Sequence, residues 1–331
     1  MSFKILNLRP QEVSSPEDHK FASTVLEGLS KKEKYLPSWL IFDDRGSEIF
    51  KEITELESYH PAVCELEILQ SHKETISDIV SPEPFQLIEL GSGVGCKTHI
   101  LIEHFLKKQL QFDYIPIDIS CGAIENLVGL VKSKYSDTAI SVTGVVADYF
   151  QGLEKFCVNK QKRNFVLYLG ITLGNQELSQ AKIFLSQLSK ALNAGDYLMI
   201  GFDLLKHPQK LYHAYNDPQG LFEKFNLHVL DRINRQLGAN FNITNFVHQG
   251  YYNWRSRAVE SYIYSTKEQT VQVEALDREF HFKYGEGMQT EHSYKFTLAE
   301  IEKLAEENGF EVREHLFDAN KNFVDSIWKV K

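Results

Sequence analysis

Long hydrophobic runs, basic clusters and paired cysteines are all scarce in this chain of 331 residues. No apolar segment approaches the length needed to cross a bilayer, and the N-terminus lacks the apolar core of a signal peptide. The four cysteines are scattered without Cys-x-x-Cys spacing, which is typical of free thiols in a reducing cytosol. The longest basic run is Lys31-Lys32-Glu33-Lys34 and the net charge is −9, so nucleic acid is a poor candidate partner. We expect a cytoplasmic monomer that acts on a small molecule, with no membrane contact and no metal.

What the sequence does contain is a regular alternation of strand and helix signals from residue 85 onward. Short apolar runs lie near 85–90, 113–118, 139–146, 164–170 and 195–202, and helical periodicity separates most of them. Such alternation with short connections predicts a parallel sheet covered by helices on both faces. After Asp203 the pattern changes to strand-like alternation over residues 247–296, and a helix and a closing hairpin follow. Residues 1–17 are polar and are expected to be loosely held.

One stretch, Phe85 to Thr98, is a strand, then a Gly91-x-Gly93-x-Gly95 turn, then helix-forming residues. Glycine has no Cβ, so such a turn lets a nucleotide-like ligand approach the main chain at a helix N-terminus. The spacing favours an adenosyl ligand, because a dinucleotide turn prefers its third glycine one residue later. A second buried strand ends at Asp118, where nucleotide folds carry a ribose-binding acid. The alternatives are a tight turn without a ligand at the glycines, and caps or turns at Asp118 and Asp148.

Several motifs together resemble the histidine-specific S-adenosylmethionine-dependent methyltransferase family. The most specific are Asp43-Asp44-Arg45-Gly46-Ser47 and the stretch Thr290-Glu291-x-Ser293-x-Lys295-Phe296. The other matching pieces are Leu36-Pro37-Ser38, Glu89-Leu90-Gly91-Ser92-Gly93, Tyr114–Ser120, Leu169–Asn175, Ala214–Asp217 and Phe225-Asn226. The resemblance implies an α/β fold of the class I methyltransferase type, a Rossmann-like and mostly parallel seven-stranded sheet with a smaller α+β substrate-binding domain. The expected parts are an N-terminal segment 1–60 that joins the substrate domain, a cofactor domain of 61–202 and 297–331, and an inserted substrate domain 203–296.

The resemblance also implies roles for individual residues. S-adenosylmethionine would lie against Gly91 and Gly93, with Lys97 at its carboxylate, Asp118 on the ribose hydroxyls, and Asp148 and Tyr149 at the adenine. The substrate site would consist of Tyr59, Phe50, Asn175, Tyr215, Glu291 and Ser293, and Asn175 and Tyr59 would serve catalysis. Glu291 and Ser293 are two residues apart in an extended segment, so both side chains can face one imidazole ring. Without the surrounding motif, the same pair would be read as a solvated strand face.

The expected reaction is methylation of the α-amino group of L-histidine, up to trimethylhistidine (hercynine), as in ergothioneine biosynthesis. Two positions depart from the family pattern, because Phe42 replaces a tyrosine and Ser261 stands where a methionine is expected. Both departures affect the wall around the ring, so an N-methyltransferase of the same family acting on another amino acid or amine is the main alternative. A nicotinamide oxidoreductase and a non-enzymatic scaffold are weaker ones, since the chain has no Tyr-x-x-x-Lys pair and keeps both sets of polar groups.

Overall fold

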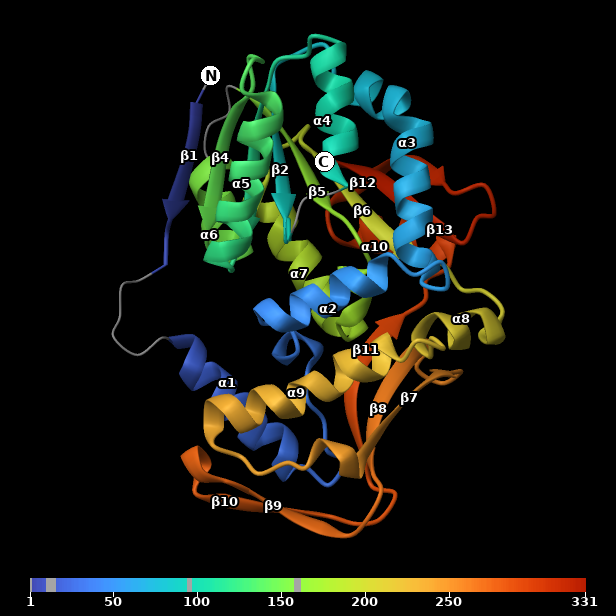
Figure 1. Ribbon diagram of the computed structural model, residues 1–331. Coiled ribbons are helices and arrows are strands. Elements are labelled where there is room, and N and C mark those ends of the chain that lie inside the picture. Colours follow the sequence, from blue (N-terminus) through green and yellow to red (C-terminus); the bar gives the residue numbers. More distant parts are fainter. Residues whose placement is uncertain (1, 10–15, 94–96, 158–161) are drawn as a thin grey trace.

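The computed structural model describes residues 2–9, 16–93, 97–157 and 162–331, and it contains two lobes stacked one above the other (Figure 1). Within these residues the upper lobe has an eight-stranded sheet, ordered β1-β4-β3-β2-β5-β6-β13-β12. The strands are β1 (Ser2–Asn7), β2 (Phe85–Leu90), β3 (Phe112–Asp118), β4 (Ser141–Val146), β5 (Arg163–Tyr168), β6 (Tyr197–Asp203), β12 (Phe310–Phe317) and β13 (Phe323–Val330). The first six run parallel and the closing hairpin β12–β13 is antiparallel, which confirms the expected α/β class.

The expected number of seven strands is wrong, because the N-terminus adds an eighth. Strand β1 lies parallel to β4, with Ser2 opposite Ser141 and Asn7 opposite Val146. The sequence gives little sign of this strand, since it is at the edge of the sheet and most of its side chains are exposed. Its main-chain hydrogen bonds to β4 depend on the partner strand and not on an apolar pattern of its own. Residues 2–7 are therefore part of the cofactor lobe, whereas the following helix α1 (Pro16–Ser30) packs in the other lobe.

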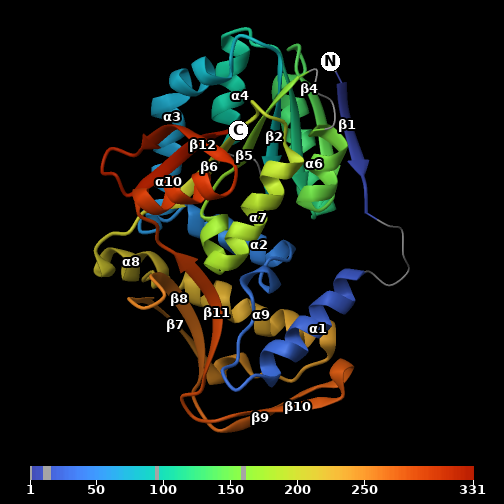
Figure 2. The ribbon, with the colours of Figure 1, turned by 180° about the vertical axis from the view of Figure 1, so that it is seen from behind.

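Helices cover both faces of the sheet, and each face has its own apolar core. Figure 1 shows one face with α3 (His60–Val80), α4 (Thr98–Lys107) and α5 (Cys121–Tyr135) in front of it. Figure 2 shows the other face, covered by α6 (Tyr149–Cys157), α7 (Leu178–Ala191) and α10 (Leu298–Glu307). Since both faces are covered, the central strands are apolar on both sides, which explains why they read as continuous hydrophobic runs in the sequence.

The lower lobe has a separate core built from helices and antiparallel strands. Strands β11 (Gly287–Tyr294), β8 (Ala258–Ser265) and β7 (Phe246–Asn253) form one sheet, and β9 (Gln269–Val273) pairs with β10 (Arg278–Phe282). Helices α1, α2 (Asp44–Thr54), α8 (Pro208–Tyr215) and α9 (Leu221–Leu237) pack with them. The antiparallel insert expected from residues 247–296 is therefore present, and α6 and α8 are helices that the sequence analysis did not identify.

Two connections place the lower lobe at the carboxyl ends of the parallel strands. Strand β6 ends at Asp203, where the main-chain N–H of Phe296 donates to the Asp203 carbonyl over 3.0 Å. The short helix η2 (Thr172–Asn175), which follows β5, packs against β11, and a Cβ at Gly174 would lie 3.0 Å from the Tyr294 carbonyl oxygen. Ligands of open α/β sheets bind at this edge. The candidate site is thus built where the two lobes meet.

Candidate active site

The glycine turn after β2 has the backbone conformation that the sequence predicted. Gly91 has φ +70° and Gly93 has φ +49°, both in the left-handed region that favours glycine. A Cβ at Gly91 would lie 2.7 Å from the Tyr149 hydroxyl oxygen, whereas a Cβ built at Gly93 would have no atom of the described, non-adjacent residues within 4 Å. The main chain at Gly93 is therefore open to a ligand. Gly95 and Cys96 lie outside the described residues.

Asp118 is held close to this turn by main-chain donors. Its Oδ2 accepts from the Gly93 N–H over 3.1 Å and its Oδ1 accepts from the Ser120 N–H over 2.9 Å. A carboxylate has four lone-pair positions, so two remain for further donors such as a ribose diol. The ribose role of Asp118 thus stays a prediction that its position permits.

Asp148 is an exposed N-cap of α6. Its Oδ1 accepts from the N–H groups of Phe150 at 2.9 Å and Gln151 at 3.0 Å, so the capping role considered for it is present. Tyr149 follows it and is half-buried, with its ring centroid 5.9 Å from that of Tyr168. Contacts of Asp148 and Tyr149 with an adenine remain predictions.

Glu89, the acid at the end of β2, is turned inward and joins three elements. It accepts from the Thr98 hydroxyl over 2.5 Å and from the Tyr114 hydroxyl, which ties β2 to α4 and β3. Burial raises the pKa of Glu89 to about 7, although both hydrogen bonds and Lys97 act in the opposite direction. The hydrogen bonds of Glu89 therefore hold together the elements on either side of the glycine turn.

A buried carboxyl pair lies behind Lys97, and the sequence analysis missed it. The Lys97 ammonium forms an ion pair with Glu65, a fully buried residue of α3 that also accepts from the Gly170 N–H. Asp325 of β13 is equally buried, and both of its carboxyl oxygens lack a donor in the described part of the chain. Burial and the neighbouring Glu65 raise the pKa of Asp325 well above its usual range. The feature of the sequence that could have indicated the pair is Gly201, a glycine inside the apolar strand β6. A Cβ at this position would clash with the Glu65 Oε1.

The groups around the glycine turn fit S-adenosylmethionine. The open main chain at Gly93 and the partly free carboxylate of Asp118 suit an adenosyl group, since a carboxylate makes strong hydrogen bonds to a diol. Lys97 provides a cation for an amino-acid carboxylate, although its present partner is Glu65. The donor set is thus adequate for the ligand that the sequence motifs imply.

Aromatic rings of the lower-lobe core form a wall on the other side of the site. Tyr59 immediately precedes α3, and its ring centroid lies 6.0 Å from that of Phe50, 6.1 Å from that of Tyr215 and 5.4 Å from that of Phe222. The Phe42 ring, which replaces the expected tyrosine, lies 5.3 Å from the ring of Phe50. The Tyr59 hydroxyl has no hydrogen-bond partner among the described residues, and it is therefore available to a ligand. Burial raises the pKa of Tyr59 well above its usual value, so the hydroxyl stays neutral.

Glu291 on β11 is half-buried next to this wall and is held in place by Asn226 of α9. The Asn226 Nδ2 donates to the Glu291 Oε2 over 2.9 Å and to the Phe222 carbonyl over 3.0 Å, while its Oδ1 accepts from the Thr290 hydroxyl over 2.5 Å. Ser261 is directly opposite Glu291 in the β8–β11 register. Burial raises the pKa of Glu291, and the Asn226 hydrogen bond opposes that increase. The solvated strand face considered for this pair is not what the structure has.

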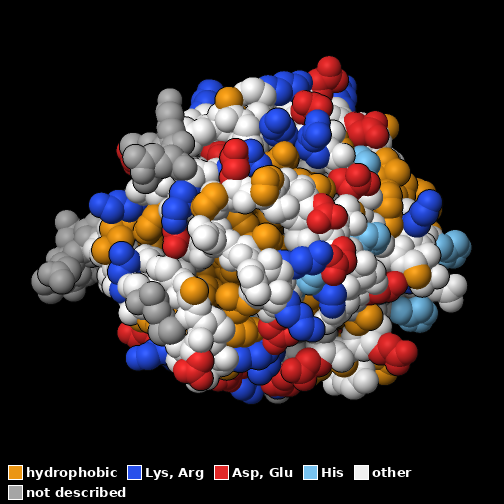
Figure 3. All heavy atoms as spheres, turned by 90° about the horizontal axis from the view of Figure 1, so that it is seen from above, with side chains coloured by type: hydrophobic (Ala, Val, Ile, Leu, Met, Phe, Trp, Pro, Cys, Tyr) orange, Lys and Arg blue, Asp and Glu red, His pale blue; other side chains and the backbone are white. Residues whose placement is uncertain are grey.

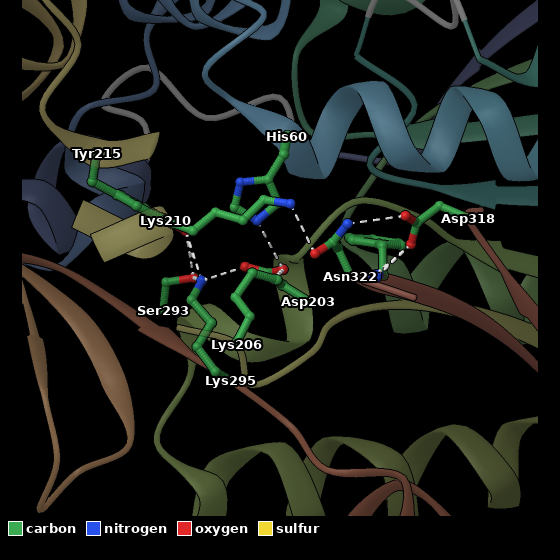
Figure 4. Close-up of polar contacts among 10 residues, drawn as sticks. His60, Asp203, Lys206, Lys210, Tyr215, Ser293, Lys295, Asp318 and Asn322 are labelled. Atoms are coloured by element: carbon green, nitrogen blue, oxygen red, sulfur yellow. Dashed lines mark hydrogen bonds and ion pairs between the residues drawn. The ribbon is translucent and has the colours of Figure 1, made fainter. Parts of the chain in front are cut away.

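Ser293 lies in a buried polar network that Figure 4 shows. Its Oγ accepts from the Tyr215 hydroxyl over 2.9 Å and from the Lys295 Nζ over 2.8 Å. Lys295 is fully buried, and its Nζ lies 2.8 Å from the Oδ2 of Asp203. Asp203 also pairs with Lys206, and the ring of His60 lies 3.4 Å from its Oδ1. Among these, Lys295 and Asp203 are residues whose importance the sequence analysis did not recognise.

Asn175 ends η2, the short helix that follows β5 and packs against β11. Its side-chain amide makes no hydrogen bond within the described ranges, and it is only partly buried. A free amide offers both donors and acceptors, so it can orient an amine and a carboxylate together. Its assignment to the substrate remains a prediction.

The Asp-Asp-Arg-Gly-Ser motif has a structural task. Asp43 is the N-cap of α2, where its Oδ1 accepts from the Gly46 N–H over 2.8 Å, and the Nε2 of His228 lies 2.7 Å from the same oxygen. Burial would raise the pKa of Asp43, but the Gly46 N–H and His228 hold it below its usual range. A Cβ at Gly46 would lie 1.9 Å from the Ile41 carbonyl oxygen, so only glycine fits there. The motif thus fixes α2, which carries Phe50, against α9.

Two further properties concern the described ranges of the chain as a whole. They contain no group of three or more His, Cys, Asp or Glu side chains placed to hold a metal ion. No helix among them is both long enough and apolar enough to traverse a bilayer.

The family model of histidine-specific, S-adenosylmethionine-dependent methyltransferases matches residues 21–330, which is almost the whole chain. The chain belongs to this family. It is thus a methyltransferase, as its glycine turn and inserted lobe indicated. Asp43, Glu291 and Lys295 all lie within the matched range.

Similar proteins include a histidine methyltransferase and a methyltransferase that is named for a different substrate. The chain is 34% identical over 272 residues to a histidine N-alpha-methyltransferase of Mycolicibacterium smegmatis, which covers 82% of this chain and 83% of that protein. It is 28% identical over 289 residues to ergothioneine biosynthesis protein 1 of Schizosaccharomyces pombe, covering 86% of this chain and 37% of that protein. It is 24% identical over 199 residues to a 4-dimethylallyltryptophan N-methyltransferase of Claviceps purpurea, covering 58% and 57%.

Proposed function

We propose that this methyltransferase methylates the α-amino group of L-histidine, up to N,N,N-trimethylhistidine, as in ergothioneine biosynthesis. The observation that carries the proposal is the pairing of a half-buried acceptor, Glu291, with the buried hydroxyls of Ser293 and Tyr215 beside an aromatic wall. A ring with one N–H and one bare nitrogen satisfies such a set. Each of these groups already has a protein partner, and an aliphatic side chain would leave unused the acceptor position of Glu291 and the hydroxyl proton that face the ligand, at a cost of about 1–3 kcal/mol each.

The amino and carboxyl groups of the substrate are assigned to Asn175 and the tyrosines. Asn175 has a free amide at the end of the parallel strands, and Tyr59 has a free hydroxyl within the aromatic wall. Holding both ends of an amino acid fixes the direction of its nitrogen, and orientation of this kind is worth about 7–11 kcal/mol in favourable cases. When bound, S-adenosylmethionine supplies an activated methyl group. The residues assigned to hold it are Gly91, Gly93, Lys97, Asp118, Asp148 and Tyr149.

The reacting amine must be neutral, and the wall around it has to exclude water. Because Tyr59 stays protonated, its oxygen can accept a hydrogen bond from the substrate ammonium but does not act as a phenolate base. The rings of Phe50 and Phe42 provide apolar surface, which suits a nitrogen that gains methyl groups. We therefore assign the orientation of the amine to Tyr59 and Asn175, and its proton to solvent.

The remaining assignments follow from the charges and the chain topology. Lysine, arginine, aspartate and glutamate side chains are interspersed on the face in Figure 3, and the net charge is −9. This distribution supports a small-molecule partner rather than nucleic acid. We propose a cytoplasmic monomer with a cofactor domain of residues 61–202 and 297–331, which strand β1 joins, and a substrate domain of 203–296 completed by residues 16–60.

The test is incubation of the purified protein with S-adenosylmethionine and a panel of amino acids, followed by mass spectrometry. The expected result is mono-, di- and trimethylated histidine from L-histidine, and no product from histamine, which lacks the carboxylate. A terminal monomethyl product would refute the trimethylation, and methylation of another amino acid in preference to histidine would refute the substrate.

That second result is the outcome expected from the alternative function, an N-methyltransferase acting on another amino acid or amine. Ser261 favours it, because a small polar residue faces Glu291 where a methionine was expected, and this makes the ring wall wider and more polar. Including tryptophan and tyrosine in the panel separates the two functions.

A further inference from the structure

Lys295 has no role in the reaction described so far, although it is completely buried beside the ring-binding residues. Its Nζ has three oxygen neighbours, which are the Asp203 Oδ2 at 2.8 Å, the Tyr215 hydroxyl at 2.9 Å and the Ser293 Oγ at 2.8 Å. An ammonium group has three protons and no lone pair, so it can only donate to these oxygens. The direction of every hydrogen bond around Lys295 is therefore fixed from its side.

This constraint determines what Ser293 and Tyr215 present to a ligand. Both oxygens accept from Lys295, and the two hydroxyls share one hydrogen bond with each other over 2.9 Å. That bond uses one of their two protons. When Tyr215 donates to Ser293, both lone pairs of the Ser293 oxygen are occupied and its own proton points away from the pair. When the bond is reversed, the Tyr215 proton points away instead. In both arrangements the pair offers a donor.

The charged groups around Lys295 also favour a neutral ligand ring. Lys295 and Lys206 both pair with Asp203, and burial lowers the pKa of His60, which keeps that ring neutral. Together with Glu291 these groups sum to zero, so a neutral ring leaves the site balanced. A protonated ring would add one more cation near Lys295 and Lys206, in a buried environment where like charges repel strongly.

From this arrangement we infer that Lys295 is a positioning residue for ring recognition, and that it makes the site take the neutral imidazole and reject the imidazolium. The inference rests on the proposed histidine substrate. Glu291 accepts the single ring N–H, and the donor held by Lys295 meets the bare ring nitrogen. The other titratable groups that face Lys295 are His60 at the start of α3, Lys206 after β6, Tyr215 on α8, Tyr252 on β7 and His292 on β11.

The test compares two substrates over a range of pH. Dissociation constants of L-histidine and of its 1,2,4-triazole analogue, whose ring stays neutral, are measured by calorimetry from about pH 5.5 to 7.5, around the usual imidazole pKa of about 6.5. The ratio of the two constants cancels the titration of the protein groups, Glu291 included. In the natural protein we expect this ratio to rise about tenfold for each unit of pH below the ring pKa.

Two variants then assign the effect to Lys295. Lys295→Met removes the cation and frees a lone pair on the hydroxyl pair, so the ratio should become nearly flat with pH. Lys206→Met removes the other cation from Asp203 without touching Ser293 or Tyr215, so it should keep the rise. If Lys295→Met does not fold, Lys295→Gln replaces it, because glutamine removes the same cation while its amide can still donate to a neighbouring oxygen.

Different results would refute the role of Lys295 and the proposed methylation of histidine. A flat ratio in the natural protein, or equal flattening by Lys206→Met and Lys295→Met, would overturn the role of Lys295 while methylation of histidine continued. Failure to form methylated histidine at any pH would overturn the proposed function itself.

Discussion

Replacing Glu291 by glutamine exchanges one carboxylate oxygen for an NH₂ group and should greatly weaken the binding of histidine. The reason lies in Asn226, whose amide cannot rotate by half a turn. Its Nδ2 donates to the carbonyl oxygen of Phe222, which can only accept, and its Oδ1 accepts from the Thr290 hydroxyl. Asn226 therefore presents an N–H to residue 291 in every case. A glutamine there must turn its oxygen toward Asn226, and its NH₂ group then faces the substrate ring.

The size of the effect follows from this mismatch. The variant has two donors, the new NH₂ group and the hydroxyl pair held by Lys295, where the ring needs one donor and one acceptor. A hydrogen bond to a charged group contributes about 1.5–3 kcal/mol, which corresponds to roughly a 10- to 150-fold loss of affinity. Since the side-chain volume is unchanged, the fold should be affected little.

The assay is the release of S-adenosylhomocysteine at increasing L-histidine concentration, with a thermal melt of each protein. We expect KM for histidine to rise by this factor while the melting temperature stays within a few degrees. Glu260→Gln is the matched control, because Glu260 on β8 is a buried carboxylate that accepts from Asn253 and Ser256 outside the ring site. An unchanged KM in Glu291→Gln, or an equal rise in Glu260→Gln, would refute ring recognition by Glu291.

Three other substitutions test the supporting structure. Gly91→Ala should destabilise the protein by about 1–3 kcal/mol in denaturant unfolding, because φ is +70° and the new Cβ would meet the Tyr149 hydroxyl. Gly285→Ala, with φ +72° and open space, should cost less, and an equal cost would contradict the clash. Asp43→Ala should lose about 2–4 kcal/mol through the lost cap and the unpaired His228, whereas the exposed Asp44→Ala should lose a few tenths. Burial and Glu65 raise the pKa of Asp325, so the folded protein keeps a proton that the unfolded chain releases above about pH 4, and the free energy of unfolding falls as pH rises. Asp325→Asn cannot ionise, so its melting temperature should gain on the natural protein between about pH 5 and 8, and parallel curves would contradict a protonated Asp325.

Much of the fold could be predicted because local pattern and tertiary environment agree in the cofactor lobe. Strands such as β2 and β3 are buried on both faces, so their apolar runs are visible without any knowledge of their neighbours. The glycines at 91 and 93 were identified for a conformational reason, and both have positive φ. Strand β1 was missed because an edge strand with exposed side chains is specified by its partner and has no pattern of its own.

The site residues divide in the same way. Glu291 and Ser293 could be placed on one face because a strand has a period of two, but nothing local shows that Asn226, 65 residues earlier, fixes the Glu291 carboxylate. The Asp43 motif was recognised as specific, yet its role as a cap held by His228 required the packing of α2 on α9. A motif indicates that a residue matters, and only its neighbours indicate why.

The sequence by itself determined the alternating architecture, the glycine turn and the family, because these depend on short-range periodicity, backbone freedom and motif spacing. Only the tertiary structure decided which charges meet. Lys295 and Asp203 are 92 positions apart, and Glu65 and Asp325 are 260 apart, yet each pair is buried together. The ionisation and hydrogen-bond direction of such groups depend on burial and on partners brought together by folding, and neither is written in the residues next to them.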